Sequence, residues 1–188
     1  MIPILTTMDD KLILEKFADE KTRDEAFRSL LEKYQQKIYW HIRRFVLDHD
    51  DANDLVQDVF IKVWKNLAKF REDAQLYTWI YRIASNESIT FLNKRKQNLN
   101  ISIDDESSGF LAESLTESSY FNGDKAQLKL QQALLTLPDK QRLVFNMKYF
   151  EDLKYEEISN ILGTSVGALK ASYHLAVKKI ENYFSETD

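Results

Sequence analysis

Residues 155–180 read YEEISNILGTSVGALKASYHLAVKKI: a short helix with an acidic start, a Gly-Thr-Ser break, and a longer helix that gains lysines. Gly163 follows the last apolar residues of the first helix, and glycine adopts the left-handed conformation that ends a helix without a Cβ penalty. Thr164 or Ser165 can then cap the next helix with a side-chain oxygen. The stretch predicts a helix-turn-helix, and DNA is therefore the leading candidate partner.

The apolar residues of both helices follow helical spacing, so the two helices can pack across the turn. The residues predicted to be buried are Ile158, Leu162, Val166, Leu169 and Tyr173. Residues 164–180 contain three lysines, one histidine and no acidic residue, so the second helix can approach phosphates without repulsion. From this segment alone, an ordinary helical hairpin with a solvated lysine face remains an alternative.

Composition narrows the class of protein. A chain of 188 residues suggests one or two domains. Its four glycines and two prolines favour long helices over many turns. The absence of cysteine excludes disulfides and thiolate metal sites. No apolar run approaches the roughly 20 residues of a membrane span, and the N-terminal sequence lacks a signal-peptide pattern, so we expect a cytoplasmic protein.

The distribution of charge is more informative than the net charge of −4. Residues 98–123 are rich in Ser, Thr and Asn and contain no basic residue. Their acidic residues are Asp104, Asp105, Glu106, Glu113 and Glu117. Such a segment is typical of a flexible linker, although a long structured loop is an alternative. We expect an all-α fold in which two small helical domains, residues 1–97 and 125–188, are joined by a flexible acidic linker over residues 98–124.

The first half carries two amphipathic patterns, which predict helices over residues 27–46 and 51–67. The apolar surface of the second helix is wider than one core-facing stripe requires. Its residues Phe60, Ile61 and Trp64 either belong to the core or form a partner-binding flank with Asp54, Gln57 and Asp58. The pattern does not decide between these two interpretations.

Residues 70–97 begin with a polar loop, Phe70–Gln75, and continue as a helix. Aromatic side chains alternate there with cations and amides, a composition that suits single-stranded nucleic acid because unpaired bases can stack while cations follow the backbone. Tyr77 and Tyr81 are the better stacking candidates, whereas we expect Trp79 to pack in the core. The cations at the helix end, residues 94–96, either contact phosphate or complement the helix dipole.

Taken together, these segments resemble bacterial sigma factors of the extracytoplasmic-function (ECF) group. DANDLVQDVFIKVW (51–64) and FREDAQLYTWIYRIASN (70–86) look like the region 2 domain of that family, and residues 134–180 look like its region 4 domain. The two motifs occur in the right order at the right separation. The resemblance covers nearly everything except the first twenty or so residues and the linker.

The resemblance implies three binding surfaces. The polymerase-binding residues would be Asp54, Gln57, Asp58, Phe60 and Trp64, which would dock on the clamp helices of the β′ subunit. The minus-ten residues, which would hold a flipped non-template base and contact nearby phosphate, would be Phe70, Arg71, Gln75, Tyr77, Tyr81, Arg82, Asn86, Lys94, Arg95 and Lys96. The minus-thirty-five residues would be Thr164, Ser165, Lys170, Ser172, His174 and Lys178. A helix from Leu134 to Tyr149 would help engage the β flap.

The implied function is to bind core RNA polymerase and direct promoter-specific initiation, with assistance to promoter melting. It requires no cofactor, no metal and no enzymatic chemistry, and an anti-sigma factor is a further candidate partner. The alternative is a helix-turn-helix regulator that acts without polymerase. A metal-dependent enzyme using residues 48–54 is disfavoured, because these acids sit where a loop meets a helix N-terminus and no second ligand cluster accompanies them.

The sequence departs from the family pattern at several positions. Ser172, Leu175 and Val177 stand where relatives often carry arginine, so the DNA contact of the recognition helix is expected to be weaker or differently distributed. Tyr77 and Asn93 also replace frequent arginines. Lys154 occupies a position where Ser or Thr commonly caps the helix, so we expect glutamates at 156 and 157 to stabilise that end instead.

Overall fold

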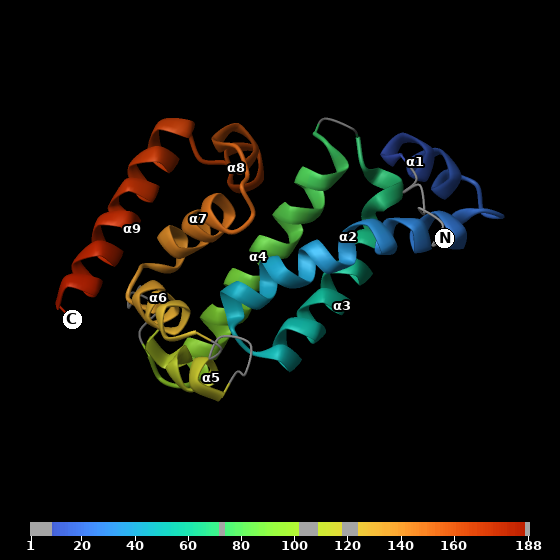
Figure 1. The fold of residues 1–188 in the computed structure, drawn as a ribbon. Helices are drawn as coiled ribbons and strands as arrows, with labels where there is room; N and C mark the ends of the chain where they lie inside the picture. The colour runs from blue at the N-terminus through green and yellow to red at the C-terminus, as the bar shows by residue number, and fades with distance from the viewer. Residues whose placement is uncertain (1–8, 72–73, 102–108, 118–123, 187–188) are drawn as a thin grey trace, which may run out of the picture.

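The computed structural model describes residues 9–71, 74–101, 109–117 and 124–186, and within these ranges the regular structure is entirely helical (Figure 1). The expected all-α fold is therefore confirmed. None of the described helices is both long enough and apolar enough to cross a membrane. The helices are α1 (Asp10–Ala18), α2 (Arg23–Val46), α3 (His49–Asn66), the 3-10 turn η1 (Leu67–Lys69), α4 (Leu76–Asn98), the 3-10 turn η2 (Gly109–Leu111), α5 (Ala112–Glu117), α6 (Lys125–Leu135), α7 (Asp139–Tyr149), α8 (Tyr155–Leu162) and α9 (Val166–Glu186).

The first half packs α2, α3 and α4 around apolar residues, with α1 against one end of α2 (Figure 1). The two helices expected over residues 27–46 and 51–67 are present as α2 and α3. The Asp48 side chain begins α3 by accepting a hydrogen bond from the Asp51 amide at 2.9 Å, which satisfies an otherwise unpaired N–H.

The helix-turn-helix is confirmed as α8 and α9. Gly163 ends α8 with φ of 65°, in the left-handed region that glycine adopts without strain. Ser165, rather than Thr164, caps α9, since its Oγ accepts a hydrogen bond from the Ala168 amide at 3.3 Å. At the start of α8 the Lys154 amide donates to Glu157 Oε2 at 2.7 Å. Glu157 thus takes over capping where the family pattern has Ser or Thr.

The prediction of a single helix from Leu134 to Tyr149 is wrong. The helix α6 ends at Leu135, and α7 begins at Asp139 after the segment Thr136–Pro138. Pro138 lacks an N–H and its ring clashes with the preceding turn, so one helix cannot continue through it. The fully buried Leu137 anchors the break in the core.

The middle of the predicted linker is helical, whereas a flexible segment without regular structure was expected. Residues Gly109–Glu117 form η2 and α5, and the side chains of Leu111 and Leu115, four apart, are fully buried. Two apolar residues at this spacing anchor one face of a short helix on the core. Residues 1–8, 102–108 and 118–123 lie outside the described residues, and with them the acidic residues Asp104, Asp105 and Glu106.

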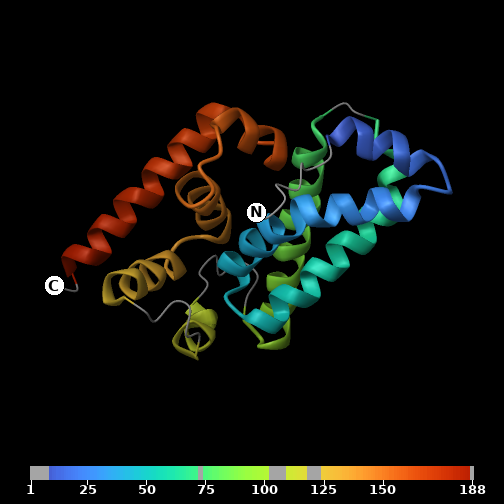
Figure 2. The ribbon, with the colours of Figure 1, turned by 45° about the vertical axis from the view of Figure 1, so that its right-hand side comes forward.

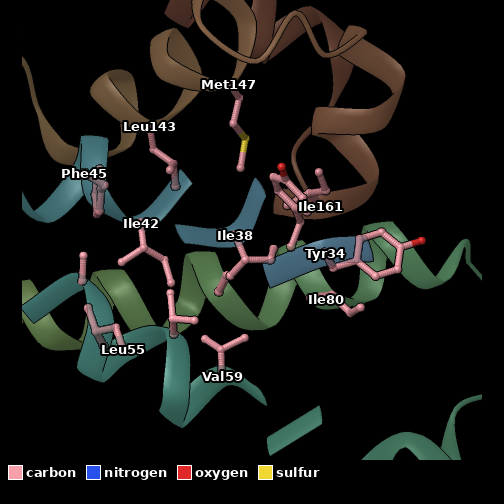
Figure 3. Packing of buried hydrophobic residues seen from close by; sticks show 14 of the residues in the cluster. Tyr34, Ile38, Ile42, Phe45, Leu55, Val59, Ile80, Leu143, Met147 and Ile161 are labelled. Atoms are coloured by element: carbon pink, nitrogen blue, oxygen red, sulfur yellow. The ribbon is translucent and has the colours of Figure 1, made fainter. Parts of the chain in front are cut away.

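The two halves share one apolar core. Ile38 and Ile42 of α2 pack in the same cluster as Leu143 and Met147 of α7 and Ile161 of α8 (Figure 3). Figure 2 shows α6–α9 lying along one side of the α2–α4 group. A second cluster, which includes Phe145, holds α6, α7 and α9 together. The described chain therefore adopts a closed arrangement in which α7 and α8 cover α2 and α4.

Candidate polymerase and nucleic-acid interface

A cavity of about 400 Å³ opens between the end of α3, η1 and α4. The rings of Phe70 and Trp79 form its apolar side, with their centroids 5.2 Å apart and their planes tilted by 43°. Ile83 continues this wall, and Asn86 adds an exposed amide. The cavity thus has one aromatic wall, and its other lining residues are polar or charged. Trp79, which we expected in the core, is half-buried at this cavity.

The polar rim of this cavity contains residues that the sequence analysis missed. Lys62 of α3 forms an ion pair with Glu87 of α4 across the rim. The Asn66 side chain donates to the Lys62 carbonyl at 2.8 Å, and Lys69 adds a second cation. Lys62, Asn66 and Lys69 follow a four-and-three spacing along α3 and η1, and this spacing was the available signal.

A second, mostly apolar groove of about 400 Å³ lies between α2 and α3 and includes Phe27, Phe60, Ile61 and Trp64. The structure divides this flank between the core and the surface. Phe60 is 5% exposed and belongs to the core, whereas Ile61 and Trp64 are 50% and 37% exposed. The Trp64 ring lies edge-on to Phe27, with centroids 4.9 Å apart. Of the polar side chains predicted for this flank, Gln57 lines the groove, and Asp54 and Asp58 are also exposed on α3.

Tyr77 and Tyr81 face the second half of the chain. Their ring centroids are 4.3 Å apart, and Tyr81 also packs against His41 at 4.9 Å. Burial, followed by the nearby negative charge of Glu151, raises the pKa of both phenols above the usual value. Tyr81 is 3% exposed, so in this arrangement it is not available to stack on a base.

Several other predicted minus-ten residues contact protein. Arg82 donates to the Asn160 carbonyl of α8 at 2.6 Å, and Arg95 pairs with Asp51 at 2.7 Å. Lys96 is 1% exposed and pairs with Asp139 of α7 at 2.8 Å, so it does not lie on the surface where a phosphate contact was expected. The predicted residues that remain exposed are Arg71, Gln75, Arg82, Asn86 and Lys94.

The recognition helix α9 presents the predicted minus-thirty-five residues more openly. Lys170, His174 and Lys178, each four apart, are exposed and lie along one face. The Lys170 ammonium lies 5.8 Å from the centre of the Tyr155 ring. Thr164 is also exposed, and Ser172 is half-buried. This face can meet a groove of duplex DNA along its length.

The acidic residues around the start of α3 have structural contacts. Asp48 caps the helix, and Asp51 pairs with Arg95. Burial raises the pKa of Asp51, and neighbouring Asp48 adds to this, while Arg95 opposes it. The part of the chain that the structure describes contains no group of three His, Cys, Asp or Glu side chains placed to hold a metal ion.

Comparison with known families matches both halves of the chain. Residues 30–98 match Sigma-70 region 2, and residues 127–180 match Sigma-70 region 4. The RNA polymerase sigma-H factor of Pseudomonas aeruginosa is 30% identical over 185 residues, which cover 95% of each protein. The ECF RNA polymerase sigma factor SigW of Bacillus subtilis is 32% identical over 166 residues, covering 82% of this chain and 87% of SigW.

Solved structures show the same fold. The sigma factor RpoE of Bartonella quintana, in complex with the anti-sigma factor NepR, superposes with a TM-score of 0.65 at 20% identity, covering 86% of this chain and 98% of that one. CnrH, in complex with the cytosolic domain of CnrY, gives a TM-score of 0.67 at 19% identity and covers 95% of this chain and 99% of that one.

Proposed function

Because this chain belongs to the ECF group of RNA polymerase sigma factors, we propose that its first half docks polymerase and holds an unpaired minus-ten base, while α9 reads the minus-thirty-five element. Sigma factors bind core RNA polymerase and promoter DNA and direct transcription initiation. They are generally initiation factors without enzymatic activity. The alternative of a helix-turn-helix regulator that works without polymerase is not favoured, since the match extends over both regions.

The polymerase surface is the groove between α2 and α3. Its exposed Ile61 and Trp64 supply apolar anchors, Gln57 lines the groove, and the exposed Asp54 and Asp58 lie on the same helix. Apolar or aromatic anchors surrounded by polar groups are the usual composition of strong protein contacts. Phe60 supports the floor of the groove and contributes through the shape of the surface.

The cavity lined by Phe70 and Trp79 is the single observation that carries the minus-ten assignment. Unpairing and unstacking one base costs a few kcal/mol, and stacking on an aromatic side chain returns about 1–3 kcal/mol per base. Asn86 offers both a donor and an acceptor to the edge of the base. Lys62 and Lys69 lie at the rim, where they can meet backbone phosphate.

The minus-thirty-five surface is the exposed face of α9 that contains Lys170, His174 and Lys178. Lys170 and His174, nearer the start of the helix, are placed for base edges, and Lys178 is placed for phosphate. With few cations on this helix, a large share of the promoter affinity must come from polymerase and from the first half. The proposed domains are residues 1–97 and 125–188.

The test is reconstitution with core polymerase. Transcripts made from genomic fragments by core polymerase plus this protein are mapped, and the sequences upstream of their start sites are compared. A shared pair of minus-ten and minus-thirty-five motifs supports the proposal. Then Trp79→Ala should reduce strand opening at such a promoter with core binding retained. Duplex binding by the protein without polymerase association would contradict the proposal.

Regulation by an anti-sigma factor is part of the proposal, since both solved relatives are complexes with a protein partner and NepR is named as an anti-sigma factor. Such a partner would act by covering the surfaces named above. The protein would work in the cytoplasm, where core polymerase is. Co-purification of the chain from its own cell would identify the partner.

A further inference from the structure

The outer face of the recognition helix α9 carries an apolar row beside its basic side chains. Leu175 is 49% exposed, and Ala171, one turn before it, is also exposed. The buried residues Leu169, Ala176 and Ile180 lie on another side of the helix, by which α9 packs on α6, α7 and α8. Both views show α9 along the outer edge of the second half (Figure 1, Figure 2). Ala171 and Leu175 therefore face away from these helices.

This apolar row adjoins the basic side chains predicted to meet DNA. Ala171 and His174 are three positions apart, as are Leu175 and Lys178, and residues at this spacing are neighbours on a helix surface. Residues 164–180 contain no acidic residue. A partner that contacts Leu175 therefore also meets the basic side chains of the same face. Negative charge on that partner is favoured, which points to DNA rather than to an apolar protein surface.

The chemistry of the Leu175 side chain limits what it can recognise in a major groove. Its isobutyl group neither donates nor accepts a hydrogen bond, and the C5 methyl group of thymine is the apolar group that base pairs present there. We infer that Leu175 is a specificity-determining residue that packs against a thymine methyl group of the minus-thirty-five element. The inference rests on the proposed function of α9, and it adds the base that this face prefers.

The residues before Leu175 allow α9 to approach the bases closely. Gly167, Ala168 and Ala171 are exposed and small, and a Cβ added at Gly167 would meet no atom within 4 Å. The major groove is about 12 Å wide, close to the diameter of a helix with its side chains. Small side chains over the first two turns let the helix axis lie nearer the base edges. A side chain as short as that of Leu175 can therefore reach a methyl group.

The test removes single methyl groups from the DNA, because one exposed leucine is by itself common on protein surfaces. Holoenzyme is assembled from core polymerase and the full chain. Each thymine of the minus-thirty-five element found by transcript mapping is replaced in turn by uracil, which lacks the C5 methyl group and keeps the hydrogen-bonding groups. Competition binding gives the ratio of the affinities for thymine and uracil DNA, and this ratio separates the methyl contact from overall binding.

We expect one uracil exchange to weaken binding of the wild-type holoenzyme about fourfold, the effect of one buried methyl group. Leu175→Ala should abolish this difference, whereas Leu175→Met keeps a long apolar side chain and should retain a ratio above about twofold. Lys178→Ala is the matched control on the same face, because it should lower the affinity for both DNAs and keep the wild-type ratio. Since Leu175 is exposed, Leu175→Ala should fold like the wild type, which circular dichroism checks.

Equal affinity of the wild-type holoenzyme for thymine and uracil DNA at every position would overturn the inference. An unchanged ratio in Leu175→Ala would overturn it as well, because the uracil effect would then arise from the flexibility of the duplex. If Leu175→Ala weakened binding to both DNAs alike, Leu175 would contact a protein instead of a methyl group. Failure of the holoenzyme to recognise any promoter would overturn the proposed function and this inference with it, whereas promoter recognition without a uracil effect overturns this inference alone.

Discussion

His41 of α2 and Glu151, which follows α7, are 110 positions apart in the sequence, yet 2.9 Å separates His41 Nδ1 from Glu151 Oε1. Both side chains are buried, at 1% and 8% exposure. A buried polar contact of this kind is weak evidence for stability, because desolvation of the two groups costs about as much as the contact returns, but its geometry is demanding. The pair therefore specifies how the halves meet more than it strengthens their contact.

Two glycines near the turn give a matched test of the helix-turn-helix. Gly163→Ala should lower the free energy of unfolding by about 1–2 kcal/mol, because its φ of 65° is unfavourable for a residue with a Cβ. Gly167→Ala should raise it by about 0.5 kcal/mol, since a Cβ there meets open space. Urea denaturation measures both, and equal effects would contradict this account of the turn.

The polymerase groove can be separated from the core beneath it. Ile61→Ala should weaken association with core polymerase about tenfold while changing stability by under about 1 kcal/mol, because Ile61 is exposed in the groove. Phe60→Ala should instead cost about 3–5 kcal/mol of stability. Affinity measurements and thermal denaturation distinguish the two. An unchanged polymerase affinity for Ile61→Ala would place the docking surface elsewhere.

The minus-ten cavity predicts a defect in strand opening. Asn86→Ala should reduce open-complex formation by about tenfold, because one hydrogen-bonded base edge loses its partner. The exposed side chain makes little contribution to folding. Permanganate reactivity of unpaired thymines measures the opening, and Gln97→Ala is the control for loss of an exposed polar side chain on the same helix, outside the predicted minus-ten set. An equal effect from both variants would argue against base recognition at Asn86.

The two lysines of α9 should behave differently toward duplex DNA. Lys178→Ala should weaken holoenzyme binding to all promoters alike. It should also make the slope of log K against log salt concentration shallower by about one unit. Lys170→Ala should cost about 1–3 kcal/mol at the preferred minus-thirty-five sequence and less elsewhere. Binding titrations over a range of salt concentrations test this, and uniform losses from both variants would assign Lys170 to phosphate as well.

Alkaline pH should lower the free energy of unfolding. Burial raises the pKa of Tyr77 and Tyr81 in the folded state, whereas an unfolded tyrosine ionises near pH 10. Above that pH the unfolded chain binds fewer protons than the folded chain, so stability falls as pH rises. Tyr81→Phe should reduce the slope by about 1.4 kcal/mol per pH unit. Denaturation from pH 9 to 11.5 measures it, and an unchanged slope would contradict burial of that phenol.

The sequence alone predicted the helical composition, the break at Gly163 and the family, because each depends on local spacing or local backbone chemistry. It placed the start of α4 after the loop at Phe70–Gln75 for the same reason. The single helix from Leu134 to Tyr149, which the resemblance implied, was wrong because Pro138 interrupts it. The sequence also missed the short helix in the linker, which the burial of Leu111 and Leu115 stabilises.

Only the tertiary structure decided which side chains of the predicted site are accessible. The apolar faces of α2, α7 and α8 show the same helical period whether they pack within one half or between halves, so periodicity cannot predict the closed arrangement. Burial of Tyr81, the ion pair of Lys96 and the contact of His41 with Glu151 all follow from that packing. The cavity lined by Phe70 and Trp79 likewise takes residues from α3, η1 and α4, so it depends on how these elements pack rather than on local sequence.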